Sequence, residues 1–143
     1  MIGRSRNLGS RARPLVRRHW RLLVAASAAL ARARGTLLLL PFERAIRHGT
    51  VPLSSRGEGG SVFDIVWAVQ AVGRRLPFRT MCIEQGLAAQ RLLRRTGVDA
   101  RLHYGARQAA DALEAHVWVS VDGTTLIGGE EASGFALIAT YPE

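Results

Sequence analysis

The chain has 143 residues, of which 48% are hydrophobic and 22% charged, and its formal net charge is +9 at pH 7. This length fits one domain with a sizeable core, and the composition is that of a globular rather than a disordered protein. Its single cysteine, Cys82, excludes an intramolecular disulfide framework and a zinc site built from several cysteines, and favours a reducing cytoplasm.

The positive charge is concentrated in the first third of the chain. Residues 1–50 hold eleven arginines and one acid, a net charge of +10, whereas residues 51–143 hold nine arginines and ten acids, a net charge of −1. No uninterrupted apolar run approaches the roughly 18–20 residues of a membrane span. We expect this segment to pack on the domain or on a partner protein, with contact to an anionic membrane surface as the alternative. The sequence has no recognisable nucleic-acid motif, so no nucleic-acid partner is expected.

The N-terminal segment, residues 1–49, is predicted to be helical. Pro14 suits the first turn of a helix, and apolar residues then recur at helical spacing until Gly35, which is expected to end it. A shorter apolar piece follows and stops at Gly49. Residues 50–60 are rich in Gly, Ser and Pro and predict a loop before the main domain, residues 61–143. The N-terminal segment and the main domain are expected to form one compact unit.

The main domain begins with a predicted helix over residues 61–76. Ser61 is expected to be its N-cap, with Asp64 three residues later in a variant of the capping box, and Pro77 to break it. The apolar residues expected to form its buried side are Phe63, Val66, Trp67, Val69 and Ala71.

A second helix and an antiparallel sheet complete the domain. Thr80 is predicted to cap a helix that runs to about Arg95 and places Cys82 in its first turn. Period-two alternation then predicts strands over residues 99–107, 114–121 and 124–128, with Asp122-Gly123 as a hairpin turn between the last two. Helices followed by such a sheet predict an α+β fold.

Cys82 and His116 form the arrangement that nucleophilic thiol chemistry requires. Unpaired N–H groups and the positive dipole end of a helix stabilise a thiolate at its first turn. A histidine on a following strand can take the thiol proton and hold the thiolate as an imidazolium. The alternative for Cys82 is a small buried packing residue.

A third polar group normally orients the imidazole, and the hairpin register suggests which one. If Asp122 and Gly123 form a two-residue turn, His116 faces Gly129, one residue from Glu130, so Glu130 is the better candidate. Asp122 lies six residues from His116, roughly 20 Å along an ideal strand. Asp122 becomes the alternative if the hairpin is distorted.

The runs "RRLPFRTMCIEQGLAAQRLLRRTGVDARLHYGAR" and "EAHVWVSVDGTTLIGG" carry a family resemblance. With these motifs the chain resembles, over about residues 62–141, the transglutaminase-like leader peptidases of lasso-peptide biosynthesis, the stand-alone catalytic halves of the lasso B protein. The resemblance implies a papain-like or transglutaminase-like α+β fold, with Cys82 as nucleophile and His116 as base. The position of the family's acid holds Gly128 here, which leaves Glu130, Asp122 or a Cys–His dyad.

The implied function is that of a cytoplasmic thiol protease, a hydrolase that cuts a ribosomally made precursor peptide (a RiPP) between its leader and core. The implied partners are the precursor, a separate small leader-binding protein and an ATP-dependent lasso cyclase. No metal or organic cofactor is expected. Two alternatives stay open: a thiol acyltransferase or amidase of the same fold, and a non-catalytic scaffold or binding protein.

Overall fold

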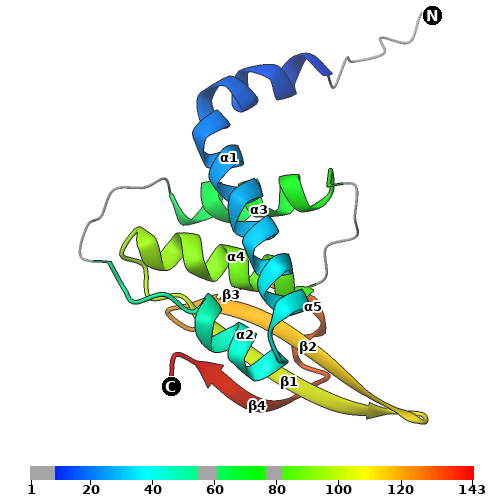
Figure 1. Cartoon of the computed structure of the whole chain (residues 1–143). Coiled ribbons are helices and arrows are strands. Elements are labelled where there is room, and N and C mark those ends of the chain that lie inside the picture. Colours follow the sequence, from blue (N-terminus) through cyan, green and yellow to red (C-terminus); the bar gives the residue numbers. More distant parts are fainter. Residues whose placement is uncertain (1–8, 55–60, 77–81) are drawn as a thin grey trace, which may run out of the picture.

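The computed structural model of the chain describes residues 9–54, 61–76 and 82–143. Helices come first and a four-stranded antiparallel sheet follows, which confirms the predicted α+β class (Figure 1). The helices are α1 (Gly9–Leu39), α2 (Phe42–Gly49), α3 (Val62–Gly73), α4 (Cys82–Arg95) and the short α5 (Gly129–Ala132). The strands are β1 (Arg101–Ala109), β2 (Ala112–Val121), β3 (Thr124–Ile127) and β4 (Ala136–Tyr141). The predicted Pro77 break, the Thr80 cap and most of the predicted loop, residues 55–60, lie outside the described residues.

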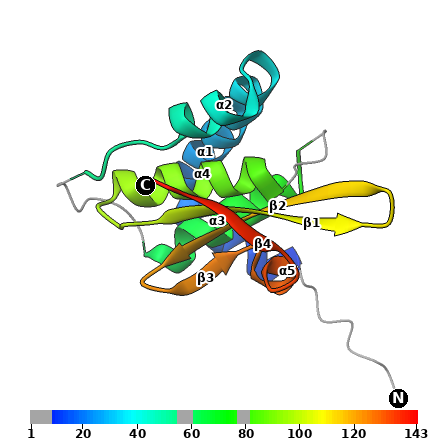
Figure 2. The ribbon, with the colours of Figure 1, turned by 90° about the horizontal axis from the view of Figure 1, so that it is seen from below.

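Helix α4 is the centre of the packing. It contacts α1 and α3 on one side and strands β1 and β2 on the other, and Figures 1 and 2 show helices α1 to α4 gathered on one face of the sheet. The largest fully buried apolar side chains come from all of these layers: Leu30, Ile46, Ile65, Leu93, Leu102, Val69 and Val119. The basic N-terminal segment therefore contributes to the same core as the rest of the chain.

Helix α1 is longer than the sequence predicted. It does not end at Gly35 but continues to Leu39, because the next strong stop is Pro41, which disfavours helical backbone at the residue before it. Backbone angles at His19 mark a kink within α1. By length and composition His19–Leu39 is apolar enough to cross a membrane, with a mean hydropathy of 1.5. The same stretch buries Ala26 and Leu30 completely in the core.

Helix α3 confirms its predicted cap and most of its predicted buried side, since Val69 and Ala71 are buried and Val66 and Trp67 pack against the core. The Ser61 hydroxyl accepts a hydrogen bond from the Asp64 backbone N–H at 3.2 Å. Phe63 is 78% exposed, so its assignment to the buried side is wrong, and Ile65 and Ala68 are buried in addition to the predicted residues. Because apolar residues occupy nearly every early position of α3, their spacing does not select one face.

The sheet order is β3-β2-β1-β4. The predicted turn is confirmed, since Asp122 and Gly123 have φ values of 48° and 78° and join β2 to β3. The predicted register holds for Val121 against Thr124 but fails further out, because an irregularity shifts it by one residue between Ser120 and Val119. Strand β4 and helix α5 were not predicted.

Candidate active site

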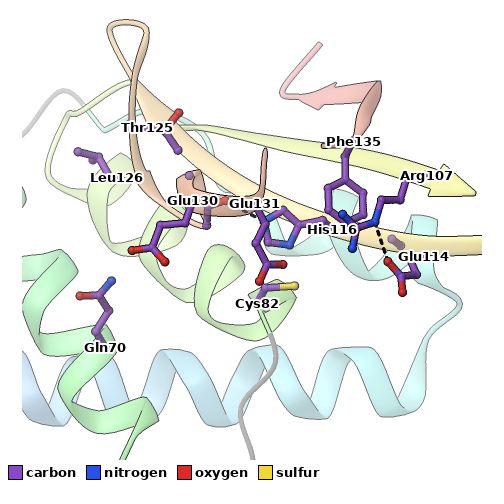
Figure 3. A pocket seen from close by; sticks show the side chains of 13 residues that line it. Gln70, Cys82, Arg107, Glu114, His116, Thr125, Leu126, Glu130, Glu131 and Phe135 are labelled. Carbon is purple, nitrogen blue, oxygen red and sulfur yellow. Dashed lines mark hydrogen bonds and ion pairs between the residues drawn. The ribbon is translucent and has the colours of Figure 1, made fainter. Parts of the chain in front are cut away.

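Cys82 and His116 lie on the wall of one cavity of about 1030 Å³ (Figure 3). Cys82 is the first residue of α4, and its thiol is free and partly exposed. His116 lies on β2 and is 7% exposed. The structure thus brings together the two residues that the sequence singled out, with the thiol at a helix N-terminus where backbone N–H groups favour negative charge.

The position of His116 follows from the unequal lengths of β2 and β3. Strand β3 ends at Ile127, so β2 runs on past its partner, and the turn at Gly128 and helix α5 pack against β2 there. The prediction that β3 continues in register and places Gly129 opposite His116 is therefore wrong. The residue that reaches the imidazole is Gly128.

The Gly128 backbone carbonyl binds the imidazole, with 2.8 Å between its oxygen and His116 Nε2. A carbonyl oxygen can only accept, so Nε2 carries the proton and Nδ1 is the basic nitrogen of the neutral ring. Gly128 has a left-handed φ of 74°, and a Cβ there would lie 2.6 Å from the Val117 carbonyl oxygen. Glycine is the residue that this backbone path admits.

Two aromatic rings contact the imidazole of His116. The Phe135 ring lies at 5.0 Å and the Trp118 ring at 6.0 Å between centroids, the latter stacked at 22°. The Trp118 ring covers Gly105 on β1, where a Cβ would come within 2.8 Å of it. Phe135 follows α5 in the chain and belongs to no helix or strand that the sequence predicted. These packed rings restrict rotation of His116 about its side-chain bonds.

Carboxylates surround the cavity but do not take the place of the Gly128 carbonyl. Glu130 and Glu131 both line it, and Figure 3 shows Glu131 pointing toward Cys82 and His116, with Glu130 pointing toward the side of Gln70. Glu131 was given no role at the site by the sequence. Asp122 stands in the hairpin turn and does not line this cavity among the described residues.

An ion pair closes one side of the cavity. The Arg107 Nε atom donates to a Glu114 carboxylate oxygen at 2.7 Å, and the Arg107 guanidinium lies 4.5 Å from the centre of the Phe135 ring. Arg107 and Glu114 face each other on β1 and β2. Because both side chains are nearly half exposed, the pair contributes little to stability and mainly shapes a polar wall.

A second histidine, His103, lies on the other side of Trp118. Its Nδ1 is 2.9 Å from the Thr140 hydroxyl and its Nε2 is 2.6 Å from the Ser120 hydroxyl. Burial, and then the nearby Arg101 charge, lower the pKa of His103 from its ordinary value. The neutral His103 ring is held by two hydroxyls and stacks on the Trp118 ring at 5.6 Å between centroids. It therefore supports Trp118, which in turn packs against His116.

Cys82 and His116 also line a second cavity, of about 470 Å³, whose wall includes Leu37 and Leu38 near the end of α1. At its edge the Arg34 guanidinium binds the carboxylate of Glu84 at 3.2 Å, and Glu84 is 5% exposed. The basic N-terminal segment thus lines a cavity that Cys82 also lines, an arrangement that the sequence did not predict. Among the described residues no group of three or more His, Cys, Asp or Glu side chains could hold a metal ion.

Comparison with known proteins finds one family. The family model described as the transglutaminase-like superfamily matches residues 5–140, which is nearly the whole chain. No curated protein and no solved structure matches the chain.

Proposed function

The chain belongs to the transglutaminase-like superfamily, and from this premise we propose that it is a cysteine peptidase that removes the leader from a ribosomally made lasso-peptide precursor. Members of the superfamily are typically cysteine proteases or acyltransferases. The observation that carries the proposal is the hydrogen bond between His116 Nε2 and the Gly128 carbonyl, because it leaves Nδ1 as the base in a cavity shared with Cys82.

In the proposed reaction His116 transfers protons to and from the reacting groups. Nδ1 of His116 takes the proton of Cys82, and the thiolate attacks the scissile carbonyl carbon. Backbone N–H groups at the start of α4 donate to the oxygen that becomes negative. The C–N bond then breaks, and the leaving amine takes the proton from His116. Water, deprotonated by His116, hydrolyses the thioester and releases the leader with a free carboxylate.

The backbone carbonyl of Gly128 takes the role of a third catalytic member in this proposal. It fixes the tautomer of His116 throughout and accepts from Nε2–H when the ring is an imidazolium. Unlike a carboxylate it carries no full charge, so it stabilises the imidazolium less. A thiol is far more acidic than a hydroxyl and needs less help from its base, which makes a neutral acceptor sufficient.

The substrate and partners are inferred from the lasso peptidase resemblance, which covers about residues 62–141. We infer a cytoplasmic enzyme that receives its precursor from a separate small leader-binding protein and passes the core to an ATP-dependent cyclase. The wide cavity beside the thiol supports a peptide substrate, because an extended chain needs room on both sides of the scissile bond.

Acyl transfer is the second candidate, because the superfamily includes acyltransferases and the thioester is common to both reactions. The two differ in the acceptor: water gives a free leader carboxylate, whereas an amine gives an amide. The product mass separates them. A non-catalytic scaffold would leave Cys82 without a chemical role and predicts slow alkylation of its thiol at neutral pH.

The test is cleavage of a lasso precursor by the full chain together with a separate leader-binding protein, followed by mass spectrometry. Cys82→Ala should abolish cleavage with little loss of stability, because alanine suits a first helical turn. His116→Ala should match that loss within about tenfold, since members of one catalytic unit are not additive. The control is His48→Ala, an exposed histidine on α2. Cleavage by Cys82→Ala at the wild-type rate would overturn the assignment.

A further inference from the structure

The cavity of about 470 Å³ differs in character from the larger one, which Cys82 and His116 also line. Its apolar wall comes from the end of α1, the start of α2, the first turn of α4 and two strands. The residues that supply this wall are Leu37, Leu38, Phe42, Ile83, Tyr104 and Val117. We call it the apolar chamber, and the larger cavity, which holds Arg107, Glu130 and Glu131, the polar chamber.

We propose that the apolar chamber binds an apolar side chain of the acyl half of the substrate, the half that stays bonded to Cys82. This inference rests on the proposed function, since it concerns the substrate of the same site. In leader removal the acyl half is the end of the leader. The N-terminal helices would then help to select the cleavage site, in addition to any binding of a partner protein or membrane surface.

Cys82 and His116 line both chambers, and we assign the two halves of the substrate from the further groups that each chamber contains. The apolar chamber is continuous with the first turn of α4, where Cys82, Ile83 and Glu84 follow one another along its wall. The polar chamber contains Gly128 and Phe135, which contact His116. The acyl group is bonded to sulfur and the leaving amine takes its proton from the imidazole. The acyl half therefore extends from the thiol side and the amine half from the imidazole side.

The chamber presents apolar surface to water in this structure. Leu38 is 73% exposed and Phe42 is 38% exposed, although the Phe42 ring also contacts the Tyr104 ring at 4.9 Å between centroids. An apolar side chain bound here would remove that surface from water, which favours binding in proportion to the area covered. An apolar pocket discriminates on the order of tenfold or more between an aliphatic side chain and a smaller one.

The charges at the edge of the chamber are already paired. Arg34 and Glu84 bind each other at 3.2 Å, and the other described lining residues, apart from Cys82 and His116, are uncharged. A charged side chain of the substrate would lose its hydration on entering and find no unpaired opposite charge on the described wall, and an amide would find few side-chain hydrogen-bond partners there. The chamber therefore selects against polar residues as well as for apolar ones.

The test uses alkylation of Cys82, the single cysteine of the chain, followed by intact mass. Peptidyl chloromethyl ketones place their residues on the acyl side, and the pair acetyl-Leu-Gly and acetyl-Asn-Gly chloromethyl ketone differ in polarity at nearly equal size. A second pair carries Leu or Asn next to the ketone. In at least one pair the leucine reagent should react on the order of tenfold faster. Chloroacetyl-Leu and chloroacetyl-Asn amides, which extend to the amine side, should differ by less than about threefold.

Two adjacent leucines give a matched pair of variants. Leu38→Asp places a carboxylate in the chamber and should reduce the leucine preference to within about threefold. Leu39→Asp is the control, because Leu39 is 84% exposed and does not line the chamber. It should keep the wild-type preference. Phe42→Gln, a second change within the chamber, should act like Leu38→Asp, and circular dichroism verifies that each variant folds.

Equal reaction of the leucine and asparagine reagents in both pairs, or equal behaviour of Leu38→Asp and Leu39→Asp, would overturn the inference. These outcomes are separate from failure of the proposed function, since alkylation needs a thiol but no peptide cleavage. Cleavage that depends on Cys82, without a leucine preference, keeps the peptidase and removes the chamber's role. A leucine preference that Leu38→Asp removes, without cleavage of any precursor, keeps the chamber and removes the peptidase.

Discussion

Gly128→Ala tests whether a backbone carbonyl orients the His116 imidazole, the proposed base. Gly128 has a φ of 74°, and its carbonyl oxygen lies 2.8 Å from His116 Nε2. An added Cβ would lie 2.6 Å from the Val117 carbonyl oxygen and 3.2 Å from Nε2. The first contact is with backbone, which cannot rotate away. We expect the turn to shift and draw its carbonyl away from His116.

The expected loss follows from the bond that the shift disturbs. A hydrogen bond to a charged group contributes about 1.5–3 kcal/mol, and the imidazolium is charged when it holds the thiolate. Since about 1.4 kcal/mol is tenfold in rate, Gly128→Ala should lower single-turnover cleavage roughly 10- to 100-fold. Left-handed backbone at alanine costs about 1–2 kcal/mol of stability in addition.

Gly123→Ala is the matched control. Gly123 has a φ of 78°, close to that of Gly128, but a Cβ there would meet no atom within 4 Å. This variant therefore carries the same backbone strain without disturbing His116, and it should cleave at close to the wild-type rate at a temperature where it is folded. Single-turnover cleavage and thermal unfolding are measured for both variants. If Gly128→Ala cleaves as fast as Gly123→Ala, the carbonyl does not orient the base.

Two further predictions concern the carboxylates and the second histidine. Glu130→Gln should lower cleavage by less than tenfold, and Asp122→Asn by less than twofold, because Glu130 lines the catalytic cavity whereas Asp122 does not; a larger loss for Asp122→Asn would place an acid from the turn at the base. The lowered pKa of His103 means that the unfolded chain binds more protons than the folded one near and below pH 6.5. The stability that His103 confers is therefore present above about pH 6.5 and lost as pH falls, so the unfolding midpoint should drop from pH 7.5 to 5.5 by less in His103→Gln than in the wild type. Equal drops in both proteins would contradict this.

The sequence predicts those features that local chemistry determines. Short stretches of sequence determine the Ser61 cap, the Asp122-Gly123 turn and the change from helical to alternating periodicity. The placement of a thiol at a helix start and of a histidine on a strand belongs to the same class. These features decided the fold class and led to Cys82 and His116.

The features that the sequence did not predict depend on contacts between distant segments. The register shift between Ser120 and Val119 and the end of β3 at Ile127 have no local signal, yet the turn that follows β3 brings the Gly128 carbonyl to the imidazole. A sequence also cannot single out a backbone hydrogen-bond acceptor, since every residue has a carbonyl group. Its one trace in the sequence is the glycine itself, because the left-handed turn that aims this carbonyl excludes a side chain.

The N-terminal segment shows why charge is a poor guide to what a segment does. Its arginines separate it from the rest of the sequence, but its apolar residues decide its position, since Ala26 and Leu30 are fully buried against the other helices. That packing directs the end of α1 toward the first turn of α4, where Arg34 binds the buried carboxylate of Glu84, two residues after Cys82. Breaking an ion pair to a buried carboxylate is costly, so this pair helps to hold the end of α1 against the first turn of α4. Arg34, Leu37 and Leu38 of α1 line the apolar chamber, so the substrate preference that we propose for the site would depend on the packing of the basic segment.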